Sequence, residues 1–227
     1  MQPHLVFTLA ATLAAMGDLA GHERRGSLVW PGRSAVLGLL GAALGIRRDE
    51  DFSALEALSV AVAVLDPGAP LRDYHTVQTV PSAAVKRPNS RPQALREAGL
   101  RANTTITLRD YRVGVACGVV VWGGDLEPLA QALQHPHFTL YFGRKSCPLS
   151  APTAPRIVTC ATPQEALTAL QLPAWLSRPT QAQWITDAAD AAAHVETRHD
   201  RAIDRGLWHF ASRRVAISRI DLPKGAA

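Results

Sequence analysis

One apolar stretch constrains the fold of this chain more than any other feature, because its pattern fits only a buried helix. It covers residues 30–48 and reads WPGRSAVLGLLGAALGIRR. Residues 35–46 within it carry no charge. Leu37, Leu40 and Leu44 recur at helical spacing and form one apolar stripe. The sequence therefore predicts a core helix that the rest of the chain must cover.

The start of this helix and its glycines carry further expectations. Ser34 is the expected N-cap. Gly38, Gly41 and Gly45 each cost about 1 kcal/mol relative to alanine in a helix interior, so we expect another backbone to pack very close to them. Arg33 precedes a helix N-terminus, where free N–H groups and the helix dipole favour an anion. The helix is therefore either purely a core element or a core element whose N-terminus also faces a phosphate.

The remaining pattern predicts a mixed α and β chain. The order strand, helix, strand, strand at the beginning favours an α+β sandwich of ferredoxin type, with helices on one face of an antiparallel sheet. Segment 78–103 holds three prolines and little apolar pattern, and is predicted to be an arm that leaves the sheet, whereas 177–206 has a weak pattern. Strands are expected at 4–10, 58–65, 71–77, 104–110, 111–122, 138–142 and 157–160, helices at 125–134 and 163–170, and a last strand or hairpin at 207–220.

Composition excludes several classes of protein. The chain has 227 residues and is 47% hydrophobic, which is typical of a globular protein, and no apolar run reaches the roughly 18 residues that span a membrane. The N-terminus has no basic region, so we do not expect a signal peptide. Cys117, Cys147 and Cys160 show no pairing or metal-ligand spacing, which favours reduced thiols in a cytosolic protein. Neither these cysteines nor the histidines predict a metal or cofactor site.

The positive charge of the chain is concentrated. The net charge is +5, and residues 86–112 alone hold seven basic residues against two acidic ones, a difference of five. Such a segment is either a contact surface for a polyanion or a solvated loop. The basic residues are Lys86, Arg87, Arg91, Arg96, Arg101, Arg109 and Arg112.

Two other groups of residues could carry chemistry. The loop Gly143-Arg144-Lys145-Ser146 offers a tight turn, two cations and a hydroxyl donor, which suits a phosphate clamp or a basic surface turn. Tyr74 and His75, together with Lys145, could cleave RNA without a metal, or could simply alternate between the two faces of a strand. No hydrolase, zinc-protease or dinucleotide motif is present.

Four stretches together resemble a known family. PGRSAVLGLLGAALGIRRDE, LRDYHTV, YFGRKSCPL and FASRR occur in this order between residues 31 and 214. They are similar to the signature stretches of the CasD family, which supplies a subunit of the type I-E CRISPR Cascade complex. One departure is Met16-Gly17, where the family usually has a Trp-Gly pair.

The resemblance implies a fold and a role. It implies a single RAMP-superfamily domain over 1–227, with a ferredoxin-like or RRM-like palm, a thumb at about 78–103 and a C-terminal part at about 150–227. It implies a non-catalytic, cytoplasmic antiviral subunit that caps the 5′ handle of the CRISPR RNA. The implied protein partners are the CasC backbone, the large CasA subunit and other Cascade subunits, and target DNA is met only indirectly. A CasD-like protein of another subtype is a metal-independent endoribonuclease, which keeps Tyr74, His75 and Lys145 as an alternative catalytic set.

The resemblance also assigns residues. The implied thumb residues are Lys86, Arg87, Arg91, Arg96 and Arg101, and the implied handle-binding residues are Arg33, Ser34, His75, Arg109, Gly143, Arg144, Lys145, Ser146 and Arg213.

Overall fold

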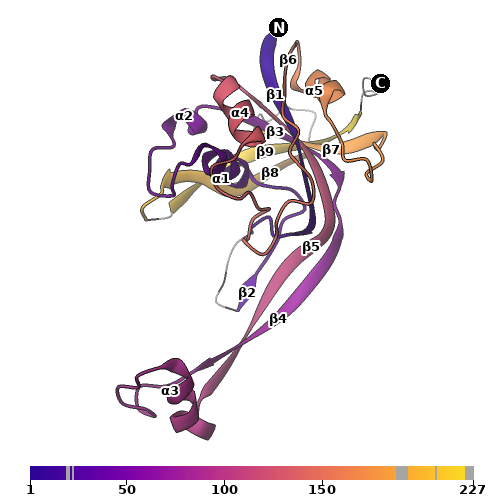
Figure 1. The fold of residues 1–227 in the computed structure, drawn as a ribbon. Coiled ribbons are helices and arrows are strands. Elements are labelled where there is room, and N and C mark those ends of the chain that lie inside the picture. Colours follow the sequence, from indigo (N-terminus) through magenta and orange to yellow (C-terminus); the bar gives the residue numbers. More distant parts are fainter. Residues whose placement is uncertain (19–20, 22, 188–193, 208, 223–227) are drawn as a thin grey trace.

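One large, mainly antiparallel sheet runs through the protein, and a long arm projects from it (Figure 1). The computed structural model describes residues 1–18, 21, 23–187, 194–207 and 209–222. The main path of the sheet has the strand order β6-β1-β5-β3-β7-β9-β8, and β2 and β4 pair with β5 beside it. The strands are β1 (Gln2–Ala14), β2 (Arg24–Arg25), β3 (Ser59–Asp66), β4 (Ala69–Thr79), β5 (Asn103–Trp122), β6 (Arg156–Cys160), β7 (Gln181–Thr186), β8 (His194–Asp204) and β9 (His209–Asp221).

Helices cover both faces of this sheet, so its central strands are apolar on both sides. Leu5 and Phe7 of β1 enter the larger core beneath the helices α1 (Arg33–Leu44), α2 (Ser53–Glu56) and α4 (Glu127–Gln134). Val6, between them, enters a smaller core beneath α5 (Pro163–Ala166) and the 3-10 turn η2 (Leu167–Ala169). This alternation is what the two-residue period of a strand requires. The architecture is the expected α+β fold with a ferredoxin-like arrangement, but the expectation of helices on one face alone is wrong, because α5 and η2 cover the second face.

The core helix forms where the sequence predicted it, but its details differ. α1 begins at Arg33, and Gly32 rather than Ser34 holds the N-cap position, with no side-chain cap hydrogen bond. A second backbone does approach α1 at its C-terminal end, where the N–H groups of His137 and Phe138 donate to the carbonyls of Ala43 and Ala42. At Gly38 and Gly41 the expectation of a closely packed backbone is wrong. A Cβ on Gly41 would lie 2.6 Å from the ring of Phe52, a side chain, and Gly38 has no neighbour within 4 Å. Gly45 ends the helix with φ at +86°.

The arm is an antiparallel ladder of β4 with the first half of β5. It carries α3 (Arg91–Ala98) and the turn η1 (Gly99–Arg101) at its far end (Figure 1). The sequence pattern divided β5 into two strands at residue 110, because its first half is mostly exposed and its second half is buried. It did not predict α3, although Ser90 caps this helix by accepting a hydrogen bond from the N–H of Gln93.

Three other expectations need correction. Residues 138–142 form no strand, and only a single bridge joins Tyr141 to Pro148. The helix expected at 163–170 is one turn of α-helix followed by η2. Segment 177–206 contains β7 and β8, and its weak pattern has a physical reason, since β8 is an edge strand with few buried side chains.

No helix among the described residues is long and apolar enough to cross a membrane. The three cysteines are free thiols. Burial raises the pKa of the Cys117 thiol to about 12.

Candidate nucleic-acid interface

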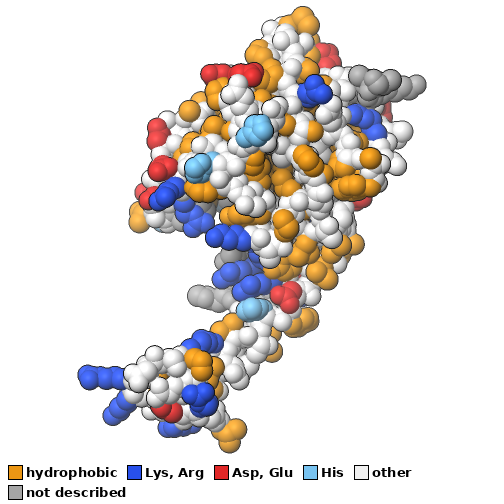
Figure 2. Space-filling view, viewed as in Figure 1, with side chains coloured by type: hydrophobic (Ala, Val, Ile, Leu, Met, Phe, Trp, Pro, Cys, Tyr) orange, Lys and Arg blue, Asp and Glu red, His pale blue; other side chains and the backbone are white. Residues whose placement is uncertain are grey.

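A hollow lies between the body of the protein and the arm, and basic side chains line it. Figure 2 shows Lys and Arg side chains along the concave side where the body meets the arm, and again around the tip of the arm. The strand register, the contact of Arg144 with Tyr111 and the chain position of Lys145 relate five residues, which we call the hollow: His75, Arg109, Tyr111, Arg144 and Lys145. These residues come from β4, β5 and the loop at 143–148.

The register of the ladder places the arm residues of the hollow on one face. His75 is paired with Thr107, Asp73 with Arg109, and Leu71 with Tyr111. Paired residues in a ladder share a face, and so do residues two apart along a strand. His75, Arg109 and Tyr111 therefore lie on the same side of the ladder. Tyr74 lies on the opposite side, where it is 70% exposed.

The loop at 143–148 is fixed to the end of β1. The N–H of Ala15 donates to the carbonyl of Phe142 at 3.0 Å, and the N–H of Phe142 donates to that of Cys147 at 2.7 Å. Gly143 has φ at +91°, and a Cβ there would lie 1.7 Å from the carbonyl oxygen of Ala15. The side chain of Cys147 is fully buried beneath the loop. Only glycine fits at this position, so the loop has one defined shape.

Arg144 and Arg109 hold nitrogens without partners in this hollow. The Arg144 guanidinium lies over the ring of Tyr111, 4.5 Å from its centroid. Nη1 of Arg144 and Nε of Arg109 are buried and make no hydrogen bond within the described part of the chain. A buried donor without a partner is costly, so a further acceptor at this place would be stabilising. Lys145 and Ser146 are exposed on the same loop.

The opposite face of the ladder is neutralised by the chain itself. Arg24 of β2 and Arg72 of β4 both bond to the carboxylate of Asp110, at 2.8 and 2.7 Å. Hydrogen bonds from Arg72 and then Arg24 lower the pKa of Asp110 to about 2. Arg112 donates to the carbonyls of Pro67 and Gly68. These arginines brace the base of the arm.

The basic residues of the arm tip also include some that bond to their own chain and some that do not. Arg91 donates to the carbonyl of Gln78, and Arg101 donates to that of Glu97. Three exposed residues make no hydrogen bond or ion pair with any residue that the structure describes: Lys86, Arg87 and Arg96.

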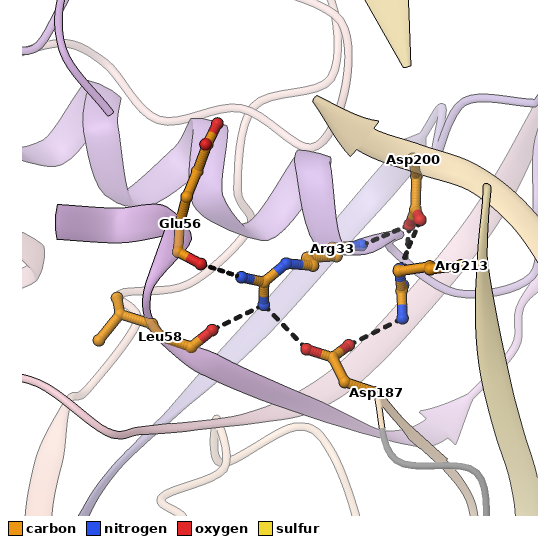
Figure 3. Close-up of polar contacts among 6 residues, drawn as sticks. All are labelled: Arg33, Glu56, Leu58, Asp187, Asp200 and Arg213. Atoms are coloured by element: carbon orange, nitrogen blue, oxygen red, sulfur yellow. Dashed lines mark hydrogen bonds and ion pairs between the residues drawn. The ribbon is translucent and has the colours of Figure 1, made fainter. Parts of the chain in front are cut away.

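Arg33, Ser34 and Arg213 lie elsewhere, at the N-terminus of α1 (Figure 3). The Arg33 guanidinium donates to the carbonyls of Glu56 and Leu58 and to the carboxylate of Asp187. Arg213 bonds to Asp187 and to a second carboxylate, Asp200. The sequence did not predict these two acidic partners, because no local motif around Asp187 or Asp200 indicates that they bond to Arg33 and Arg213. The predicted handle-binding residues therefore form two groups, one in the hollow and one at α1, and the predicted thumb residues form a third group at the arm tip.

Comparison with known proteins places the chain in a family. The family model described as "CRISPR-associated protein (Cas_Cas5)" matches residues 4–216. The chain is 35% identical over 185 residues to the CRISPR system Cascade subunit CasD of Escherichia coli K12, covering 74% of this chain and 76% of that protein.

Two solved structures share the fold. One is a chain of a CRISPR RNA-guided surveillance complex, with a TM-score of 0.72 and 24% identity, covering 97% of this chain and 91% of that one. The other is a crystal structure of a Cas protein, with a TM-score of 0.65 and 26% identity, covering 98% of both chains. Taken with the family match over nearly the whole length, these findings show that the chain belongs to the Cas5 family of CRISPR-associated proteins.

Proposed function

We propose that the chain is a non-catalytic RNA-binding subunit of a Cascade complex, and that it holds the 5′ handle of the CRISPR RNA in the hollow. The observation that carries the proposal is the pair of unpartnered guanidinium nitrogens on Arg109 and Arg144, beside the exposed Lys145. Phosphate oxygens are the acceptors that a planar guanidinium fork binds best.

The geometry of the hollow suits a single strand with a fixed path. Phosphate contacts position RNA, and unstacked bases are read by aromatic rings and guanidinium planes. The Arg144 guanidinium lies over the ring of Tyr111, and this contact favours one orientation before any ligand binds. The rigid turn at Gly143 keeps Lys145 and Ser146 at a fixed place beside it. A preorganised site loses little conformational entropy when it binds.

The arm supplies the second part of the proposal. Segment 78–103 forms its tip and carries the unpaired cations Lys86, Arg87 and Arg96. We assign it the role of the thumb, which reaches across the guide RNA. The body then provides contacts to the CasC backbone and to the large CasA subunit, in a cytoplasmic antiviral complex that meets target DNA only through its other components. The names of the relatives, a Cascade subunit and a surveillance complex, support this assembly.

The test is to replace Arg144 and Lys145 with alanine and to measure the CRISPR RNA that co-purifies with the assembled complex. We expect the RNA content to fall at least tenfold, because both cations of the loop are lost. Arg219→Ala, which removes an exposed arginine from β9, is the matched control and should leave the RNA content unchanged. Normal RNA retention in the double variant would remove this loop from the handle site.

The alternative of a metal-independent endoribonuclease is addressed by a second experiment. Tyr74 and His75 lie on opposite faces of the ladder, so only His75 can act together with Lys145 in the hollow. The purified chain is incubated with repeat RNA in EDTA. We expect no specific cleavage, and cleavage that His75→Ala abolishes would replace the binding role with a catalytic one.

A further inference from the structure

Four charged side chains form a closed cluster at the N-terminus of α1 (Figure 3). Arg33 lies 2.8 Å from one oxygen of Asp187, and Arg213 lies 2.7 Å from the other. Nε of Arg213 is 2.6 Å from Oδ1 of Asp200, and its Nη2 is 2.9 Å from Oδ2. The members come from α1, from the residue after β7, from β8 and from β9. We call these four residues the clasp.

Asp200 occupies the position where the helix N-terminus would bind an anion. The backbone N–H of Arg33 donates to Oδ2 of Asp200 at 2.8 Å. A Cβ on Gly32 would lie 2.6 Å from that same oxygen, so the carboxylate fits tightly against the first turn. Free N–H groups and the dipole favour a negative charge at this place, and a side chain from β8 supplies it.

Both terminal nitrogens of the Arg33 guanidinium are also bonded to its own chain. Its Nη1 donates to the carbonyl of Leu58 and to Asp187, and its Nη2 donates to the carbonyl of Glu56, at distances of 2.7, 2.8 and 2.7 Å. The side chains of Arg33 and Arg213 are only 12% and 13% exposed. Neither has the unsatisfied nitrogen that Arg109 and Arg144 have in the hollow.

Two further arginines join the same hairpin to the helical layer and the residues beside it. Arg198 of β8 lies over the ring of Trp30, 4.8 Å from its centroid. Arg205, in the turn after β8, lies 3.6 Å from the ring centroid of Phe52 and forms an ion pair with Glu56 at 3.2 Å. β8 is an edge strand whose only strand partner among the described residues is β9. The hairpin is thus attached to the sheet through β9, which pairs with β7 and places Val215 and Ile217 in the larger core. At the helical layer it adds these charged and aromatic contacts.

We propose that the clasp docks the C-terminal β8–β9 hairpin onto α1 and closes the helix N-terminus to phosphate. The carboxylates of Asp187 and Asp200 take the place that RNA phosphates would need. Arg33 and Arg213 are therefore positioning residues of the fold, although they lie in motifs that resemble those of an RNA-binding family. This inference rests on contacts within the chain and stands independently of the role proposed for the hollow.

The first test measures docking of the hairpin by hydrogen exchange on the full chain. Asp200→Asn keeps the size of the side chain but removes its charge. We expect amide exchange in β8 to rise at least tenfold while exchange in β1 and β5 stays the same. Asp49→Asn, on an exposed loop, is the matched control. Unchanged exchange in β8 would overturn the docking role of the clasp.

The second test asks whether RNA displaces the carboxylates. Binding of a fluorescein-labelled single-stranded RNA is measured over a range of salt concentrations, and each lost phosphate contact lowers the slope of log K against log salt by about 0.7. We expect Arg33→Ala to leave the slope unchanged. A lower slope in this variant, or tighter binding by Asp200→Asn, would show that phosphate reaches this site and would refute the inference. Failure of the wild-type chain to bind RNA would count against the hollow, whereas the exchange result would still decide the clasp.

Discussion

The clasp and the hollow are both rich in arginine, and they differ in what the arginines meet. In the clasp, Arg33 and Arg213 face carboxylates and carbonyls of the same chain. In the hollow, Arg109 and Arg144 each keep a buried nitrogen with no acceptor among the described residues. A cation that its own chain neutralises stabilises the fold, whereas Arg109 and Arg144 form no ion pair with any residue that the structure describes, so their charge is left for a ligand. The difference shows that residue type alone does not identify a nucleic-acid contact.

The largest effect on stability should come from breaking the clasp. Arg213→Ala leaves Asp187 and Asp200 without their shared partner, and removal of one member of a buried ion pair costs about 3 kcal/mol or more. Burial already raises the pKa of Asp187 against the opposing effect of Arg213 and Arg33. Urea unfolding of the variant measures the loss. Arg214→Ala removes the neighbouring, exposed arginine and should change the free energy of unfolding by less than about 0.5 kcal/mol. Equal effects of the two variants would mean that the clasp does not stabilise the fold.

A smaller loss of stability is expected from the loop of the hollow. Gly143→Ala forces a Cβ against the carbonyl of Ala15 at a positive φ, and we expect a cost of about 2 kcal/mol together with lower RNA retention. Gly114→Ala is the matched control, because Gly114 also has a positive φ, at +73°, but a Cβ there would meet nothing within 4 Å. Both variants carry the strain of a positive φ, so the difference between their thermal midpoints measures the effect of the clash with Ala15. If both variants lose the same stability, the close approach to Ala15 is not important.

The next prediction separates shape from charge in the hollow. Arg144→Lys keeps the positive charge but loses the planar group that lies over Tyr111. We expect RNA affinity to fall about threefold to tenfold, with little change in the free energy of unfolding, because a cation–π contact and a bidentate fork are lost. Filter binding with the assembled complex measures the change. Wild-type affinity in the lysine variant would show that charge alone matters at this position.

The smallest effect concerns pH at the base of the arm. The pKa of Asp110 is lowered to about 2 in the folded chain, below its ordinary value of 3.8, so folding favours its ionised form. The stabilisation is complete above pH 4 and is lost as the pH falls toward 2. Amide exchange in β4 should rise over this interval, and Asp110→Asn should show the higher exchange at every pH. Asp73→Asn, on the other face of the same strand, should retain the pH dependence of the wild type.

The sequence was most informative where a signal is local. The uncharged stretch at 35–46 predicted the core helix, and its leucines at helical spacing identified the buried face, since Leu37 and Leu40 are both in the core. The bend at Gly143 and its adjacent cations predicted a defined basic loop, because a short motif contains all the residues that shape it. Residues 78–103 were predicted to leave the sheet, whereas Gln78, Thr79 and Asn103 still belong to the ladder of β4 and β5. The capping signal of Ser90 and Gln93 was present and could have predicted α3.

Long-range contacts were not visible in the sequence. Arg33 bonds to Asp187, which is 154 positions away in the sequence, and to Asp200, which is 167 positions away, and no local pattern links them. The same holds for Tyr111, whose place beneath Arg144 depends on the register of β5 and on the fold of a loop more than thirty residues away. By itself, the sequence determined the apolar periods, the turns and the location of positive charge, because these depend on neighbours along the chain. Only the tertiary structure decided which arginines are neutralised, because that depends on which strands and loops the sheet brings together.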